Sequence, residues 1–148
     1  VIRNRRLGGD LDPGRAALYA MFHDAPEIIT GDMPTPVKYF SKDTAAAYKR
    51  IETAAVDRLL SLLPADLRPE YEDLFCEDET YRPIVKAADK LSAYIKCIQE
   101  EKMGNDEFRV AGESMRRSVA AMGLPEADIF AEEFLRSFRL TLDELTEA

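Results

Sequence analysis

Apolar residues recur every three or four positions along most of this chain, which is the spacing of one face of an α-helix. The strongest repeat begins near Arg82 and Pro83 and predicts a helix that ends at Gly104. A second repeat predicts a helix from about Asp43 to Leu63. The apolar positions are Ile84, Ala88, Leu91, Ile95 and Ile98 in the first repeat and Ala47, Ile51, Ala54, Ala55, Leu59 and Leu62 in the second.

Further helices are predicted from the same period and from their flanking residues. Asp12 and Pro13 form a helix start, because a carboxylate caps the first N–H groups and proline lacks a donor that this position does not need. Pro26 should end that helix at about Ala25, since a residue before proline avoids the helical region. The predicted segments are Arg15–Asp24 with an apolar stripe of Ala17, Leu18, Met21 and Phe22, then Glu70–Phe75, Asn105–Met122, and a last helix carrying Ile129, Phe130, Phe134, Leu135 and Phe138.

The stretch from Thr30 to Tyr39, TGDMPTPVKY, interrupts the helical pattern. Its prolines, threonines and glycine predict a loop. We find no alternating strand pattern, no internal repeat and no low-complexity segment in the sequence. The prediction is therefore an all-α fold of helices packed on helices, and 148 residues suit a single domain.

Charge narrows the range of partners. The chain has 28 acidic and 20 basic residues and a formal net charge of -8, which disfavours a nucleic-acid polymer as a ligand. A small phosphate ester stays possible, because a bound metal reverses the local charge. No apolar run approaches the roughly 18 residues of a membrane helix, so no membrane partner is expected.

Two features bear on the setting of the protein. Cys76 and Cys97 show no CxxC spacing, and we interpret them as reduced thiols in a cytoplasmic protein. The first residue is Val1 and not methionine, so we expect that the true N-terminus lies further upstream.

The only histidine of the chain, His23, is followed directly by Asp24. A single histidine at the end of an apolar stripe is more often structural than functional. At a helix end, however, an imidazole and an adjacent carboxylate can converge on one ion. Glu27 follows three residues later, close enough to serve a water molecule on that ion.

Asp89 is a second unusual carboxylate, because it lies on the strongly apolar helix that begins near Arg82. One interpretation is an exposed aspartate flanked by Lys86 and Lys90. The other is a group that faces a second helix, which the small residues Ala87 and Ala88 would allow to approach. Buried carboxylates are rare unless they are paired or bind metal, so the second interpretation points to a ligand.

These residues carry a resemblance. The string HDAPEIITGDMPTPVKYF, residues 23–40, resembles the HD signature and following loop of bacterial HD-domain 5'-deoxynucleotidases. The flanking strings NRRLGG, KAADKLSAYIKC, EEKMGNDEF and SFRLTLDEL fit the same family, so the resemblance covers nearly the whole chain. It implies one all-α HD-domain helical bundle over residues 1–148 and a metal-dependent hydrolase of deoxyribonucleoside 5'-monophosphates. It also implies a cytoplasmic homodimer.

The resemblance assigns roles to single residues. His23, Asp24 and Asp89 match three of four ligands of a divalent transition metal such as cobalt, manganese or zinc, and Glu27 matches the catalytic carboxylate. The fourth ligand is an earlier histidine, and the family also has an arginine that orients the phosphate. We therefore expect a preceding helical segment that carries both. The expected substrate contacts are Asp24, Asp32, Met33, Pro34, Thr35 and Asp89.

Other functions stay open at this point. A related HD hydrolase would act on guanosine tetraphosphate or a nucleoside triphosphate, but the loop TGDMPTPVK favours the monophosphate enzymes. A catalytically silent HD module would only bind nucleotide or dimerise. A plain helical interaction domain would require His23, Asp24, Glu27 and Asp89 to coincide by accident.

Overall fold

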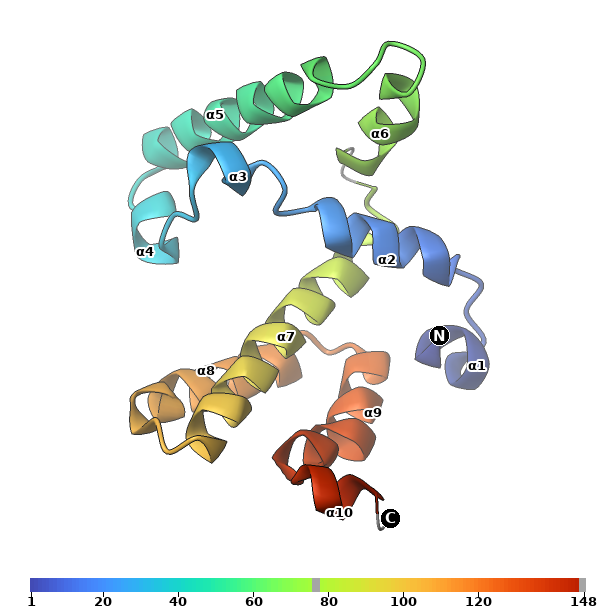
Figure 1. The fold of residues 1–148 in the computed structure, drawn as a ribbon, viewed down its shortest axis with the longest axis vertical. Coiled ribbons are helices and arrows are strands. Elements are labelled where there is room, and N and C mark those ends of the chain that lie inside the picture. Colours follow the sequence, from blue (N-terminus) through green and yellow to red (C-terminus); the bar gives the residue numbers. More distant parts are fainter. Residues whose placement is uncertain (76–77, 147–148) are drawn as a thin grey trace. The chain divides into compact units, whose positions relative to one another are not determined.

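The computed structural model describes residues 1–75 and 78–146, with only the backbone of Thr35, and most of these residues are helical (Figure 1). Within these residues there is no strand, which confirms the predicted all-α class. The α-helices are α1 (Ile2–Leu7), α2 (Pro13–Phe22), α3 (Glu27–Thr30), α4 (Thr35–Lys38), α5 (Lys42–Ser61), α6 (Arg68–Phe75), α7 (Arg82–Lys102), α8 (Arg109–Ala120), α9 (Pro125–Phe134) and α10 (Leu142–Thr146), and the 3-10 helices are η1 (Asp106–Phe108) and η2 (Leu135–Arg139).

The chain divides into two compact units, and it passes from one to the other within α2 and again between α6 and α7. The terminal unit consists of Val1–Ala16 and Glu79–Ala148, and the central unit consists of Ala17–Asp78. Among the described residues, no helix is both long and apolar enough to cross a membrane.

The core of the terminal unit lies along α7. Ala87 and Leu91 of α7 are buried with Val119 of α8 and Ala127 of α9. Further along α7, Ile98 is almost completely enclosed. The apolar repeat predicted from Arg82 to Gly104 therefore forms the central helix of this unit, as expected.

Capping at the start of α2 follows the sequence prediction. The Asp12 carboxylate accepts hydrogen bonds from the backbone N–H groups of Gly14, at 2.8 Å, and Arg15, at 3.3 Å. Asp12 also donates its own backbone N–H to the Tyr81 hydroxyl, at 3.2 Å. These bonds replace the partners that the first turn of a helix lacks.

An apolar cavity of about 430 Å³ lies within the terminal unit, between α1, the start of α2, α7 and α9. Ile2, Leu11, Ile84, Leu91 and Phe130 are among the residues that line it. Arg3, Asn4 and Glu126 are the charged and polar residues among its lining.

In the central unit, α3 and α4 lie beside the long helix α5 (Figure 1). Tyr48, Ala55 and Leu60 are the buried residues of α5. At the other end of this unit, the Phe22 ring meets the rings of Tyr71 and Phe75 edge to face, with centroids 5.8 and 5.9 Å apart.

Several predicted boundaries need correction. The predicted loop from Thr30 to Tyr39 contains the short helix α4, and α2 ends at Phe22, before the predicted end. The segment predicted from Asn105 begins as the 3-10 helix η1, and the last predicted helix ends at Phe134. Leu135 and Phe138 consequently lie in η2.

The predicted apolar stripes are also partly wrong. Met21 is 74% exposed and Ile51 is 52% exposed, while Tyr19 and Tyr48 are the buried aromatic residues of α2 and α5. A tyrosine has an apolar ring and a polar tip, so it can be buried wherever its hydroxyl finds a partner. The predicted stripes of these two helices included no tyrosine and therefore missed Tyr19 and Tyr48.

Candidate active site

His23 and Asp24 stand directly after the last residue of α2. The backbone stays in turns there, because the N–H of His23 donates to the Tyr19 carbonyl at 3.0 Å and the N–H of Ala25 donates to the Phe22 carbonyl at 3.0 Å. Both side chains are exposed. The predicted position of the pair at a helix end is thus confirmed.

The ring of His23 has a defined hydrogen-bonding state. Its Nδ1 lies 2.7 Å from the carbonyl oxygen of Ala20, which can only accept, so Nδ1 carries the proton. In the neutral ring, Nε2 then presents a lone pair, and it lies 3.1 Å from Oδ2 of Asp24.

This separation suits two ligands of one ion. Atoms bonded to a metal at about 2.0–2.2 Å lie roughly 3.0–3.5 Å apart in common geometries. A neutral imidazole beside a carboxylate is a donor set that divalent transition metals accept. His23 and Asp24 therefore form a candidate metal site.

Glu27 begins α3 and is half-buried. Its backbone N–H donates to the Asp24 carbonyl at 2.9 Å, so the turn fixes it near the pair. Burial raises the pKa of the Glu27 carboxyl, and the carboxylates of Asp24 and Asp32 raise it further against the opposing charges of Lys38 and His23. A carboxyl group with a raised pKa is suited to taking up a proton near neutral pH.

Gly31 changes the direction of the backbone after α3. Its torsion angles, φ 70° and ψ 156°, belong to a region that is essentially restricted to glycine. Asp32 and Pro34 follow with exposed side chains, and Met33 is half-buried. The side chain of Thr35 lies outside the described part.

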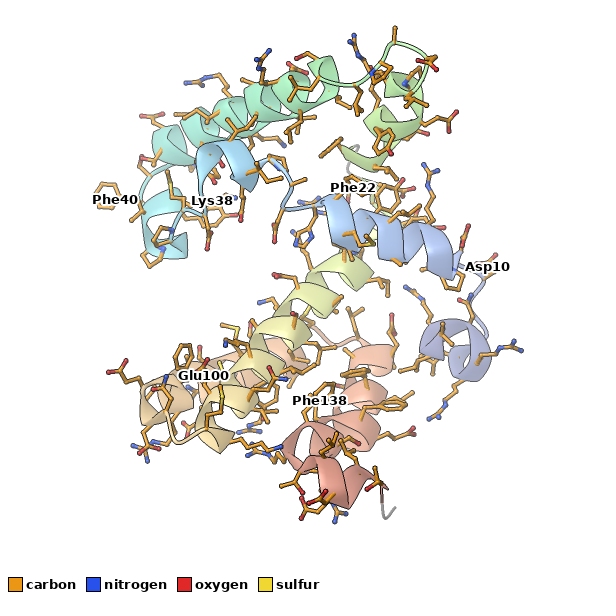
Figure 2. The ribbon with its side chains drawn as sticks, in the orientation of Figure 1. Asp10, Phe22, Lys38, Phe40, Glu100 and Phe138 are labelled. Carbon is orange, nitrogen blue, oxygen red and sulfur yellow. The ribbon has the colours of Figure 1, made fainter. Side chains whose placement is uncertain are left out.

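The carbonyl of Pro34 starts α4, because it accepts the backbone N–H groups of Val37 at 2.8 Å and Lys38 at 3.0 Å. Lys38, the last residue of α4, turns toward α5 (Figure 2). Its Nζ lies 2.7 Å from Oε1 of Glu52 and 4.4 Å from the centre of the Tyr48 ring. Sequence reasoning did not select Lys38, although it belongs to the quoted string TGDMPTPVK.

Asp89 belongs to the terminal unit, on α7. Its side chain is exposed, and it is Ala87 that is buried against α8 and α9, while Ala88 is exposed. Of the two interpretations of Asp89, the exposed aspartate is therefore confirmed, and the helices that pack on α7 contact the face of Ala87 instead.

Residues 1–138 match the family described as YfbR-like 5'-deoxynucleotidases. The chain belongs to the YfbR-like family. A 5'-deoxynucleotidase of Shewanella oneidensis is 43% identical to this YfbR-like chain over 150 residues, covering 99% of the chain and 77% of the relative. A 5'-deoxynucleotidase of Klebsiella pneumoniae strain 342 is 44% identical, with 99% and 75% covered, and one of Vibrio vulnificus is 40% identical, with 99% and 77% covered.

Membership of the YfbR-like family confirms the resemblance found in the sequence and makes the chain a member of an enzyme family. An HD-type phosphohydrolase uses a divalent metal, and the donor set of His23 and Asp24 fits such an ion.

Proposed function

We propose that the protein hydrolyses deoxyribonucleoside 5'-monophosphates to deoxyribonucleoside and phosphate with the help of a divalent metal. The observation that carries this proposal is the His23–Asp24 pair, with Nε2 and Oδ2 3.1 Å apart, in a chain whose family is the YfbR-like 5'-deoxynucleotidases. The relatives that cover 99% of the chain are themselves named 5'-deoxynucleotidase.

The metal would be held by His23, Asp24 and Asp89, and residues 1–148 would form one HD domain. A bound cobalt, manganese or zinc ion would lower the pKa of water and offset the charge of the phosphate ester. The predicted substrate contacts are Asp24, Asp32, Met33, Pro34, Thr35 and Asp89.

Glu27 would act as the general base. It accepts one proton from water as the water oxygen forms a bond to phosphorus. The bond between phosphorus and the 5'-oxygen would break, and Glu27 would pass its proton to the leaving 5'-oxygen to give the nucleoside. The partial burial of Glu27, which is the largest cause of its raised pKa, suits this role, because a base with a higher pKa holds the transferred proton better.

Selectivity for deoxyribose would come from the loop from Thr30 to Lys38. Pro34 and Pro36 fix two backbone φ angles and remove two donors, so this wall is rigid before the substrate arrives. A ribose 2'-hydroxyl would find neither room nor a partner. Leaving such a hydroxyl unpaired costs about 1–3 kcal/mol, which is roughly 5- to 150-fold in rate.

The test measures phosphate release by the full-length protein with added Co²⁺, Mn²⁺ or Zn²⁺. Paired deoxyribo- and ribonucleoside 5'-monophosphates are compared, and 3'-monophosphates serve as controls. We expect rapid release only from the deoxyribonucleoside 5'-monophosphates. Equal rates on each pair would overturn the steric explanation. Release only from nucleoside triphosphates or guanosine tetraphosphate would indicate the alternative HD hydrolase, and nucleotide binding without release would indicate a silent module.

We also propose a cytoplasmic homodimer. Ile28, Val37, Tyr39 and Phe40 of the central unit are 52% to 84% exposed, and Figure 2 shows Phe40 pointing away from the helices of this unit. Exposed apolar groups of this kind often cover each other in symmetric dimers. A monomer mass in light scattering at micromolar concentration would overturn the dimer.

A further inference from the structure

Lys38, Tyr48 and Glu52 form a cluster that connects α4 to α5 within the central unit (Figure 2). Tyr48 and Glu52 are four residues apart on α5 and therefore lie on the same face of that helix. The Lys38 ammonium donates to Glu52 at 2.7 Å and lies over the Tyr48 ring at 4.4 Å. We call these three residues the Lys38 cluster.

The charge of Lys38 is largely engaged by this cluster. The side chains of Lys38 and Glu52 are 26% and 32% exposed, so water screens their attraction only in part. Burial alone would lower the pKa of Lys38, but the hydrogen bond and charge of Glu52, together with Tyr39 and Tyr48, raise it above its ordinary value. Lys38 is thus a stable cation whose main partner is Glu52.

Tyr48 of this cluster also contacts Gly31, the first residue of the segment 31–38. Tyr48 is only 3% exposed, and its hydroxyl donates a long hydrogen bond of 3.4 Å to the carbonyl of Gly31. The buried side chain of Tyr48 therefore contacts both Gly31 and Lys38, which are the first and last residues of the segment that carries Asp32.

We propose that Lys38 is a positioning residue, which holds residues 31–38 against α5 through Glu52 and Tyr48 and so sets the affinity for the sugar of the nucleotide. The inference rests on the proposed function, because that function places the substrate against Asp32, Met33 and Pro34. Lys38 then acts through the segment and does not contact the phosphate.

Two variants separate this role from direct phosphate binding. Lys38→Met removes the charge and keeps the length of the side chain, and Glu52→Gln removes the partner charge. Lys49→Met, at an exposed position of α5, is the matched control. We expect each of the two variants to raise the KM for a deoxyribonucleoside monophosphate about 5- to 10-fold with kcat nearly unchanged, and the double variant to be no worse than either.

The sugar-free ester p-nitrophenyl phosphate provides the second substrate. Because this ester has no sugar that could contact residues 31–38, its hydrolysis should stay at the wild-type level in both variants. Lys38→Arg keeps the charge, so its KM for the deoxyribonucleoside monophosphate should be close to that of the wild type. Loss of rate on both substrates in Lys38→Met, with no effect of Glu52→Gln, would overturn the proposal in favour of a phosphate-binding lysine.

Hydrogen exchange of residues 31–38 tests the inference without turnover. Exchange should accelerate in Lys38→Met and in Glu52→Gln and stay unchanged in Lys49→Met. Unchanged exchange in the first two variants would overturn the positioning role whatever the kinetics. Absence of deoxynucleotide hydrolysis by the wild type would overturn the proposed function instead, and the exchange result would still decide the role of Lys38.

Discussion

His23 uses its two ring nitrogens differently, since Nδ1 is bound to the Ala20 carbonyl and Nε2 faces Asp24. The backbone contact selects the tautomer whose Nε2 lone pair can bind an ion.

His23→Ala and Asp89→Asn should each lower the affinity for Co²⁺ or Zn²⁺ by about 10-fold or more, as measured by elemental analysis after dialysis. Asp57→Asn, an exposed aspartate on α5, should keep the wild-type metal content. Full metal content in Asp89→Asn would remove Asp89 from the ligand set.

Glu27 differs from the ligands in its expected phenotype. Glu27→Gln keeps the size of the side chain but cannot accept the proton, so turnover should fall by on the order of 10²–10⁴-fold while metal content is unchanged. Glu70→Gln, at the exposed start of α6, serves as the control. Metal loss in Glu27→Gln would make Glu27 a ligand and contradict the role of base.

Cys97 is a free thiol that is only 5% exposed, which confirms the expected free thiol at this position, while Cys76 lies outside the described residues. Burial raises the pKa of the Cys97 thiol, and the charges of Glu101 and Glu100 raise it further, so less thiolate is present at pH 8. We expect iodoacetamide to modify Cys97 slowly in the native protein and quickly in urea, as measured by peptide mass spectrometry. Equal rates in both conditions would contradict the buried position.

The residues that sequence reasoning found and missed differ in a physical way. His23, Asp24 and Glu27 are close in sequence, so one turn brings them together. Lys38 and Glu52 are 14 residues apart, and their ion pair depends on how α4 packs on α5. No periodicity of apolar positions contains that information.

At the scale of elements, α7 and α8 approach closely where Gly112 faces Cys97. A Cβ atom at position 112 would lie 3.2 Å from the Cβ of Cys97 and 3.5 Å from Oε1 of Glu101. Gly112→Leu should therefore destabilise the fold by about 1–3 kcal/mol in urea unfolding, because the core has no space for the added carbons. The neighbouring exposed variant Ala111→Leu should change stability little, and equal midpoints for both variants would show that the two helices can separate freely.

Sequence periodicity predicted the long helices α5 and α7 well, because each repeat extends over several turns. It failed at α4 and η2, where a few hydrogen bonds decide the structure. The Pro34 carbonyl accepts two N–H groups and thereby makes a helical turn within a proline-rich stretch. Proline is compatible with such a first turn, so its presence alone does not distinguish a loop from a short helix.

At the scale of the whole molecule, the net charge of -8 should disfavour binding of a nucleic-acid polymer much more than binding of a mononucleotide. Each phosphate of a single-stranded DNA adds repulsion from the acidic surface, whereas one phosphomonoester interacts mainly with the metal site. A 20-nucleotide DNA at about 0.15 M salt should neither bind measurably nor inhibit hydrolysis of a deoxyribonucleoside monophosphate. Inhibition below micromolar DNA concentration would contradict this expectation and indicate a basic channel that the overall charge conceals.

The backbone at Gly31 has a consequence for protein engineering. A Cβ atom added there would meet nothing within 4 Å, so the available space alone would suggest that any amino acid is tolerated at this position. Its torsion angles nevertheless cost an L-amino acid on the order of 1–3 kcal/mol, and the chain would recover that energy by turning away from α5. A library that randomises the codons for residues 30–38 to broaden substrate range should therefore keep the codon of Gly31 fixed, because every other amino acid there would alter the course of the whole segment.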